Sequence, residues 1–230
     1  MSIAANVAAA RERIAAACAR VGRRPDEVRI VAASKMQPAA AIAEAIAAGV
    51  DAIGENRVQE AAGKRTLVAG GPPWHLIGPL QRNKAKVALE LFDVVETVDR
   101  AELADRLEAL LAPPDRLLPV LIEVNIDAEP QKSGVLPAHA DELAIHVVSR
   151  CSHLALVGVM AVPPWHPDPE RSRPYFAALR ELAARIAART GSAPLELSMG
   201  MSEDFEVAVG EGATTVRLGR VLFGERVTGT

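Results

Sequence analysis

The stretch VRIVAASKMQPAAAIAEAIAAGVDAIG, residues 28–54, contains one complete strand–helix–strand repeat. Its opening run, residues 28–33, is apolar apart from Arg29 and predicts a buried strand. Pro38 suits the first turn of the helix that follows, and Gly49 suits the residue just past its end. The run 51–53 then predicts a second strand, which ends at Gly54. Two strands joined by a helix in this way are expected to be parallel.

The same repeat continues along the chain. Strands are predicted at 28–33, 51–53, 74–77, 93–97, 118–124, 155–160, 195–197 and 215–218. Helices are predicted at 2–21, 38–49, 55–69, 81–90, 99–111, 137–150, 169–190 and 202–210, with a short helical piece from 220 onward. Eight strands in 230 residues favour an α/β fold with a single closed (β/α)8 barrel, a TIM barrel, over an open sheet. The helix at 2–21 is extra, and no linker divides residues 1–230 into further domains.

Composition excludes several other classes of protein. Half of the residues are hydrophobic and 24% are charged, which is ordinary for a globular chain. A net charge of -3 with 3% aromatic residues gives no basis for binding nucleic acid. No run reaches the ~18 apolar residues of a membrane helix, and the first 20 residues lack the charge order of a signal peptide. The chain is therefore expected to be cytoplasmic and not to associate with membranes.

The cysteines and most of the histidines give no sign of a metal site or a disulfide. Cys18 and Cys151 have no such spacing and are expected to be small buried side chains. His139, His146, His153 and His166 also show no metal-ligand spacing. His75 lies inside an apolar strand, where a histidine is more often a core residue with a hydrogen-bond partner.

Lys35 directly follows the first apolar strand. Reactive residues of such barrels collect at the carboxyl ends of the strands, and the chain has only five lysines. If both faces of the sheet cover Lys35, burial lowers the pKa of its amine and makes it nucleophilic. The alternative is a rim lysine paired with a carboxylate such as Glu55. Asn56, at the end of the next strand, either contacts a ligand or ties loops together.

A second group of polar residues follows strands seven and eight. Residues 198–204, SMGMSED, predict a strand end, a glycine turn and a helix start, where amides and hydroxyls bind phosphate well. Ser202 could equally be a simple helix cap. Gly219 and Arg220 strengthen the phosphate interpretation, because barrels often bind phosphate after strands seven and eight. Arg217, inside the last strand, needs an acceptor, either in a structural ion pair or in the ring nitrogen of a cofactor.

Seven segments, in order, give the chain a strong resemblance to a known family. They are VAASKMQP around Lys35, GENRVQE from Gly54, WHLIGPLQRNK from Trp74, EVNIDAEPQKSG from Glu123, LVGVMAVPP from Leu156, LSMGMSEDFEVAV from Leu197 and VRLGRVLFGER from Val216. Together they resemble the pyridoxal 5′-phosphate (PLP) homeostasis protein family, which is related to the N-terminal barrel of alanine racemase.

The resemblance implies a fold type III PLP-binding barrel that holds PLP as a Schiff base on Lys35. It also implies cofactor homeostasis and delivery to PLP-dependent apo-enzymes rather than robust catalysis. By the same resemblance the phosphate lies against Ser198, Met199, Ser202, Gly219 and Arg220, with Arg217 near the pyridine nitrogen and Lys132 assisting cofactor exchange. Position 220 departs from the family, which commonly has a small hydroxylated residue there.

A PLP-dependent amino-acid racemase is the alternative function. Racemization by two bases needs a second acid/base opposite the lysine, which alanine racemase takes from a further domain. The one tyrosine of this chain, Tyr175, lies in the helix 169–190, and no further domain is predicted. These features favour a carrier, and a monomer is expected because the main contacts of the racemase dimer are absent.

Overall fold

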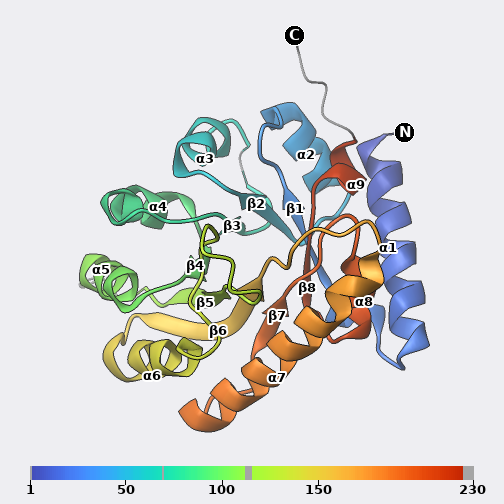
Figure 1. Cartoon of the computed structure of the whole chain (residues 1–230). Coiled ribbons are helices and arrows are strands. Elements are labelled where there is room, and N and C mark those ends of the chain that lie inside the picture. Colours follow the sequence, from blue (N-terminus) through green and yellow to red (C-terminus); the bar gives the residue numbers. More distant parts are fainter. Residues whose placement is uncertain (1, 69, 112–115, 225–230) are drawn as a thin grey trace.

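Eight parallel strands close into a barrel in chain order, with the helices outside it (Figure 1). The structure is a computed structural model that describes residues 2–68, 70–111 and 116–224. The strands are β1 Arg29–Ala33, β2 Ala52–Glu55, β3 Trp74–Leu76, β4 Val94–Val98, β5 Leu118–Val124, β6 Leu154–Ala161, β7 Glu196–Ser198 and β8 Thr215–Leu218. β8 pairs with β1, Leu218 opposite Ala32, and closes the ring. The predicted (β/α)8 barrel is confirmed.

The outer layer consists of helices that follow the strands. They are α2 Ala39–Ala47, α3 Val58–Arg65, α4 Ala85–Leu91, α5 Ala101–Leu111, α6 Ala140–Arg150, α7 Arg173–Thr190, α8 Phe205–Gly210 and α9 Arg220–Phe223. Single 3-10 turns lie at Pro25–Glu27, Arg82–Lys84 and Pro169–Ser172. The predicted helices correspond to these elements, with ends that differ by at most four residues. Residue 69 of the helix predicted at 55–69, and residues 225–230 beyond α9, lie outside the described residues.

Three helices, α3, α6 and α8, begin three residues later than predicted. The helix expected at 55 begins at Val58, because β2 continues through Glu55. The helix expected at 202 begins at Phe205, because the Asp204 carboxylate accepts a 2.8 Å hydrogen bond from the Met201 amide and holds the intervening residues in a turn. Ser202 is therefore not the cap of α8.

The extra N-terminal helix, α1 (Ile3–Arg20), packs against α2, α8 and α9 (Figure 1). Asn6 donates a 2.8 Å hydrogen bond to the Leu222 carbonyl of α9. Arg13 pairs with Glu206 of α8 at 3.2 Å, and its guanidinium lies 4.5 Å from the centre of the Phe205 ring. Since α9 has only four residues, α1 takes the place in the outer layer that a full last helix would fill.

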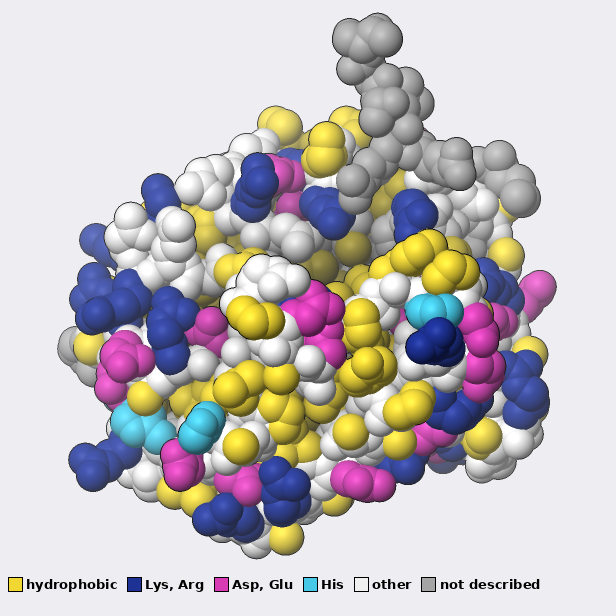
Figure 2. Space-filling view, in the orientation of Figure 1, with side chains coloured by type: hydrophobic (Ala, Val, Ile, Leu, Met, Phe, Trp, Pro, Cys, Tyr) yellow, Lys and Arg dark blue, Asp and Glu magenta, His cyan; other side chains and the backbone are white. Residues whose placement is uncertain are grey.

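Aliphatic side chains fill the core, as the shortage of aromatic residues predicts. Of the largest fully buried side chains only four are aromatic: Trp74, Phe92, Phe176 and Phe205. Cys18 and Cys151 are buried, as expected. Every helix in the described ranges is too short or too polar to cross a bilayer. On the face seen in Figure 2, acidic and basic side chains are mixed around the edge, with hydrophobic side chains between them.

Candidate functional site

Lys35 lies in a turn at the rim of the barrel, two residues beyond the carboxyl end of β1. Ser34 before it is fully buried, but Lys35 and Met36 are exposed. Met36 has a φ of 62°, a left-handed conformation that non-glycine residues adopt rarely. The expectation that the sheet buries Lys35 is therefore wrong, because the turn carries this side chain away from the covered faces of the strand.

Glu55, at the end of β2, is completely buried. Its Oε1 accepts hydrogen bonds of 2.6 Å from the Ser34 hydroxyl and 2.6 Å from Lys64 Nζ on α3. Lys64 also donates to the Ser34 carbonyl at 2.9 Å, so α3 is tied to the residue that precedes Lys35. The sequence left Glu55 open as a partner of Lys35, whereas the structure places Oε1 on Lys64. Lys64 follows Glu60 by four residues, a helical ion-pair spacing that could have identified it.

A cleft of about 890 Å³ opens beside this turn. Its lining includes Lys35, Asn56, Arg57, Glu60 and Lys84. Three of these residues are cationic and one is anionic, so the cleft favours a negatively charged ligand. Its volume is in the range of about 300–1,000 Å³ that small-molecule sites occupy. The structure thus brings Lys35 and Asn56 together in a cleft suited to a small anion.

Arg217, on β8, extends into a buried polar network. Its guanidinium donates to the Ser198 carbonyl at 2.7 Å, to the Ser198 hydroxyl at 2.6 Å and to the Ala161 carbonyl at 2.8 Å. Glu96 lies 4.0 Å away. Burial holds the pKa of Arg217 below its ordinary value, against the opposing charges of Glu96, Glu123 and Asp204. The acceptor that the sequence required for Arg217 is thus supplied by the protein.

Glu96, on β4, links this arginine to His75. One Glu96 oxygen lies 2.6 Å from His75 Nδ1 and the other accepts a 2.5 Å hydrogen bond from Ser198. Burial alone would raise the pKa of Glu96. The hydrogen bond and charge of His75, the charge of Arg217 and the hydrogen bond from Ser198 outweigh it, so the pKa of Glu96 is lowered. His75 is the core histidine with a partner that the sequence favoured.

Ser202, Gly219 and Arg220 meet where β7 and β8 end. The Ser202 hydroxyl accepts a 3.3 Å hydrogen bond from the first turn of α9. Arg220 pairs with Glu203 at 2.5 Å. A Cβ built on Gly219 would lie 3.4 Å from the Ala33 carbonyl oxygen, so this corner adjoins the end of β1.

Two of the predicted phosphate residues are committed elsewhere. The Ser198 hydroxyl donates to Glu96 and accepts from Arg217. The Met199 amide donates to the Thr215 carbonyl at 3.0 Å, and its side chain is fully buried. The Ser198 hydroxyl and the Met199 amide are thus both engaged within the protein. Both precede the tight turn at Gly200, where φ is 92° and a Cβ would lie 2.6 Å from that of Ala208.

Lys132, in the loop after β5, is apart from Lys35. It lines a smaller cavity of about 140 Å³ with Glu123 and Asn125, and it does not belong to the described residues around the Lys35 cleft. It forms ion pairs with Asp127 and, at 3.2 Å, with Glu129. Burial would lower the pKa of Lys132, but these carboxylates outweigh it and raise the pKa, so Lys132 stays protonated.

Glu123, on β5, is a second acid near Arg217, and its side chain is partly buried. Burial, then the charge of Asp99, raises its pKa to about 7, against the lowering effect of Arg217. Its Oε2 has no hydrogen-bond partner in the described part of the chain. No role was predicted from the sequence for Glu123 or Glu96, although each is a charged residue inside an apolar strand, as Arg217 is.

A (β/α)8 barrel with a lysine just beyond the first strand defines a class of barrel that known proteins share. The model of the alanine racemase N-terminal domain family matches residues 5–227. The pyridoxal phosphate homeostasis protein of Escherichia coli K12 is 43% identical over 233 residues, 97% of each chain. That of Aquifex aeolicus is 41% identical over 216 residues, 94% of each chain.

A solved structure agrees with these relatives. PipY of Synechococcus elongatus with PLP bound is 35% identical, with a TM-score of 0.83 over 97% of this chain and all of its own. The chain belongs to the alanine racemase N-terminal domain family and, within it, to the pyridoxal phosphate homeostasis proteins. The resemblance drawn from the seven sequence segments is confirmed.

Proposed function

We propose that this chain binds PLP as a Schiff base on Lys35 and serves intracellular PLP homeostasis and delivery. The observation that carries the proposal is the position of Lys35, which lines a cationic cleft at the carboxyl end of β1. Bound PLP supplies an aldehyde that condenses with a lysine amine and a ring that withdraws electrons from it. The relatives named for PLP homeostasis and the PLP-bound PipY structure support this choice of ligand.

The residues of the site suit such a ligand. Lys35 supplies the amine, and its side chain is exposed at the rim of the barrel. For the phosphate we propose Ser202, Gly219 and Arg220, which adjoin the end of β1. Ser198 and Met199 then shape this corner through the turn that they begin, and Asn56 contacts the ligand from the cleft. Arg217 is proposed to face the pyridine nitrogen, and Lys132 to assist exchange from the neighbouring cavity.

Borohydride trapping tests the role of Lys35. The full chain is incubated with PLP, reduced and digested, and the modified peptide is identified by mass spectrometry. The adduct is expected on Lys35 and absent from K35A. Lys84 lines the same cleft, so K84A is the matched control and should keep the adduct. An adduct on Lys84 with Lys35 unmodified, or none at all, would refute the proposal.

We propose holding rather than turnover of PLP. Tyr175 lies near the start of α7 in the outer layer, and the described residues around the Lys35 cleft do not include it. A proton acceptor opposite the lysine would thus have to come from elsewhere. Amino-acid racemization by the PLP-loaded chain should not exceed that by free PLP. Steady turnover that is abolished in K35A would support the racemase instead. This outcome would refute the carrier role but not the proposal that PLP binds to Lys35.

The remaining proposals concern the setting of this activity. Residues 1–230 act as one cytoplasmic domain, a monomer, that passes PLP to PLP-dependent apo-enzymes. Light scattering after size exclusion tests the monomer against the 24.3 kDa mass of the chain. Reactivation of an apo-enzyme by the loaded chain, faster than by the same amount of free PLP, tests delivery.

A further inference from the structure

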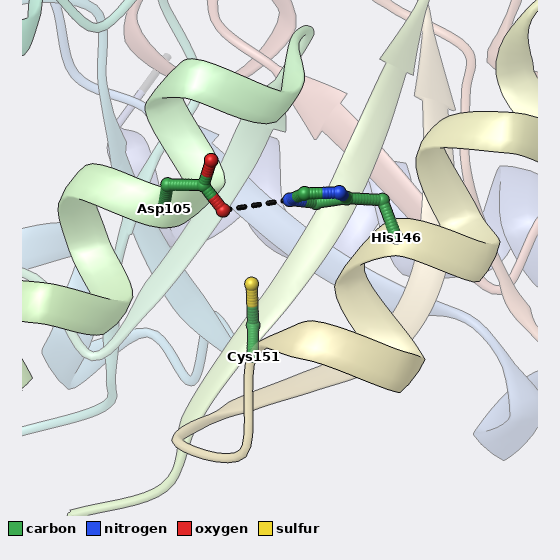
Figure 3. A group of neighbouring side chains, drawn as sticks. All are labelled: Asp105, His146 and Cys151. Carbon is green, nitrogen blue, oxygen red and sulfur yellow. Dashed lines mark hydrogen bonds and ion pairs between the residues drawn. The ribbon is translucent and has the colours of Figure 1, made fainter.

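A cluster of metal-ligating side chains lies far from Lys35 along the strands. Asp105 is on α5, His146 is on α6, and Cys151 directly follows α6 (Figure 3). β6 begins at Leu154, so Cys151 is at the amino end of its strand. Lys35, by contrast, follows the carboxyl end of β1. The cluster therefore belongs to the opposite end of the barrel from the proposed PLP site.

The three side chains converge on one point. Their ligand atoms all lie within 4.8 Å of one another, and His146 Nε2 is 2.6 Å from an Asp105 oxygen. In Figure 3 the Cys151 sulfur points toward this hydrogen bond from below. Ligand atoms around a tetrahedral zinc ion are separated by about 3.4–3.6 Å, from the usual zinc–ligand lengths. Small side-chain rotations that open the Asp105–His146 bond would give this spacing.

The charge around the sulfur favours a cation. The carboxylates of Glu108 and Asp105 both act electrostatically on the Cys151 sulfur. Two negative charges thus act on the same sulfur, and a dication would be attracted by both. Glu108 is itself held by His153, whose Nδ1 lies 2.7 Å from it. This second carboxylate–imidazole pair fixes the wall of the cluster beside Cys151.

We propose that Asp105, His146 and Cys151 bind one divalent ion of the zinc class, with solvent in the fourth position. Imidazole with a thiolate selects zinc-like ions, whereas magnesium and calcium prefer all-oxygen sites. Asp105 is exposed, so an ion reaches the site from solvent past it. Binding replaces the thiol proton by the metal, and the proton leaves to solvent. The ion would join α5 to α6 and stabilise the outer layer independently of PLP.

Cobalt titration of the full chain under reducing conditions tests the site, because cobalt bound to a thiolate has a charge-transfer band. We expect one equivalent to bind, the band to disappear in C151S, and zinc to displace the cobalt. C18S is the matched control, since Cys18 is buried in α1 outside the cluster, and it should keep the band. No band in the native chain, or a band that survives in C151S, overturns the proposal.

The variant H146N tests the site even if C151S fails to fold. His146 is only partly buried, so H146N should fold, and its melting temperature without metal should match that of the native chain. Its zinc affinity should fall about tenfold or more, as for other changes that disturb a zinc site. Zinc should also raise the melting temperature of the native chain but not that of H146N. Equal zinc affinity in the two chains would refute the site.

Discussion

Replacing Glu123 by glutamine should make the fold more stable at alkaline pH and change it little in mild acid. Glu123 has a buried Oε2 without a hydrogen-bond partner in the described chain. Burial and the charge of Asp99 raise its pKa to about 7 from 4.5. Between these values the folded chain keeps a proton that the unfolded chain has lost. The stability contributed by Glu123 therefore falls as pH rises through this window and stays low above it.

The size of the effect follows from the pKa. Since each pKa unit is worth about 1.4 kcal/mol, ionised Glu123 costs the fold about 3 kcal/mol above the window. Glutamine keeps the shape of the side chain without this charge. From about pH 5 to about pH 8.5, the free energy of unfolding of E123Q should therefore rise by about 2–3 kcal/mol relative to that of the native chain.

Urea unfolding of the PLP-free protein at the two pH values measures this difference. Other groups that titrate are the same in both chains and cancel in the comparison. E90Q is the control, because Glu90 is an exposed acid on α4, and its difference from the native chain should not depend on pH. If E123Q and the native chain lose stability in parallel as pH rises, ionisation of Glu123 does not destabilise the fold and the reasoning from its raised pKa is refuted.

Two further variants test the rim and the β7 turn. K64M removes the ion-pair partner of fully buried Glu55 and should cost about 3–5 kcal/mol in urea unfolding. K84M changes a lysine that lines the Lys35 cleft and should cost under about 1 kcal/mol, so similar losses in the two variants would refute the buried pair. G200A places a Cβ 2.6 Å from that of Ala208 at a φ of 92° and should cost about 2 kcal/mol or more in thermal unfolding. G191A, at a φ of 68° with open space around it, should cost about 1 kcal/mol, and equal losses would contradict the close contact at Gly200.

The strands were predictable because each is a short apolar run bounded by glycine, proline or polar residues. β5 and β8 have the predicted bounds, and the others differ by one or two residues. The start of α8 was not predictable from Ser202, because a carboxylate two residues later closes the preceding turn. A helix start depends on which of several polar side chains reaches the amides, and that choice is made by the surrounding structure.

The strand-end positions of the candidate residues were more predictable than their surroundings. Lys35 was located at the strand end, but the turn at Met36 that exposes it leaves no pattern in the sequence. The sequence indicated that His75 and Arg217 need hydrogen-bond partners. In the structure His75 is bonded to Glu96, and Arg217 is bonded to Ser198. The partners come from other strands, so only the closed barrel reveals them.

The contacts of α1 bear on the order in which the chain acquires its native form. Asn6 and Arg13 bind partners 216 and 193 positions further along the sequence, and β1 completes its ladder only with β8. During synthesis α1 and β1 therefore keep apolar surface exposed until almost the whole polypeptide has left the ribosome and their partners have been made. Contacts of such long sequence separation slow folding and leave partly folded chains prone to aggregate. Ring closure is thus the step at which a chaperone would have most to protect.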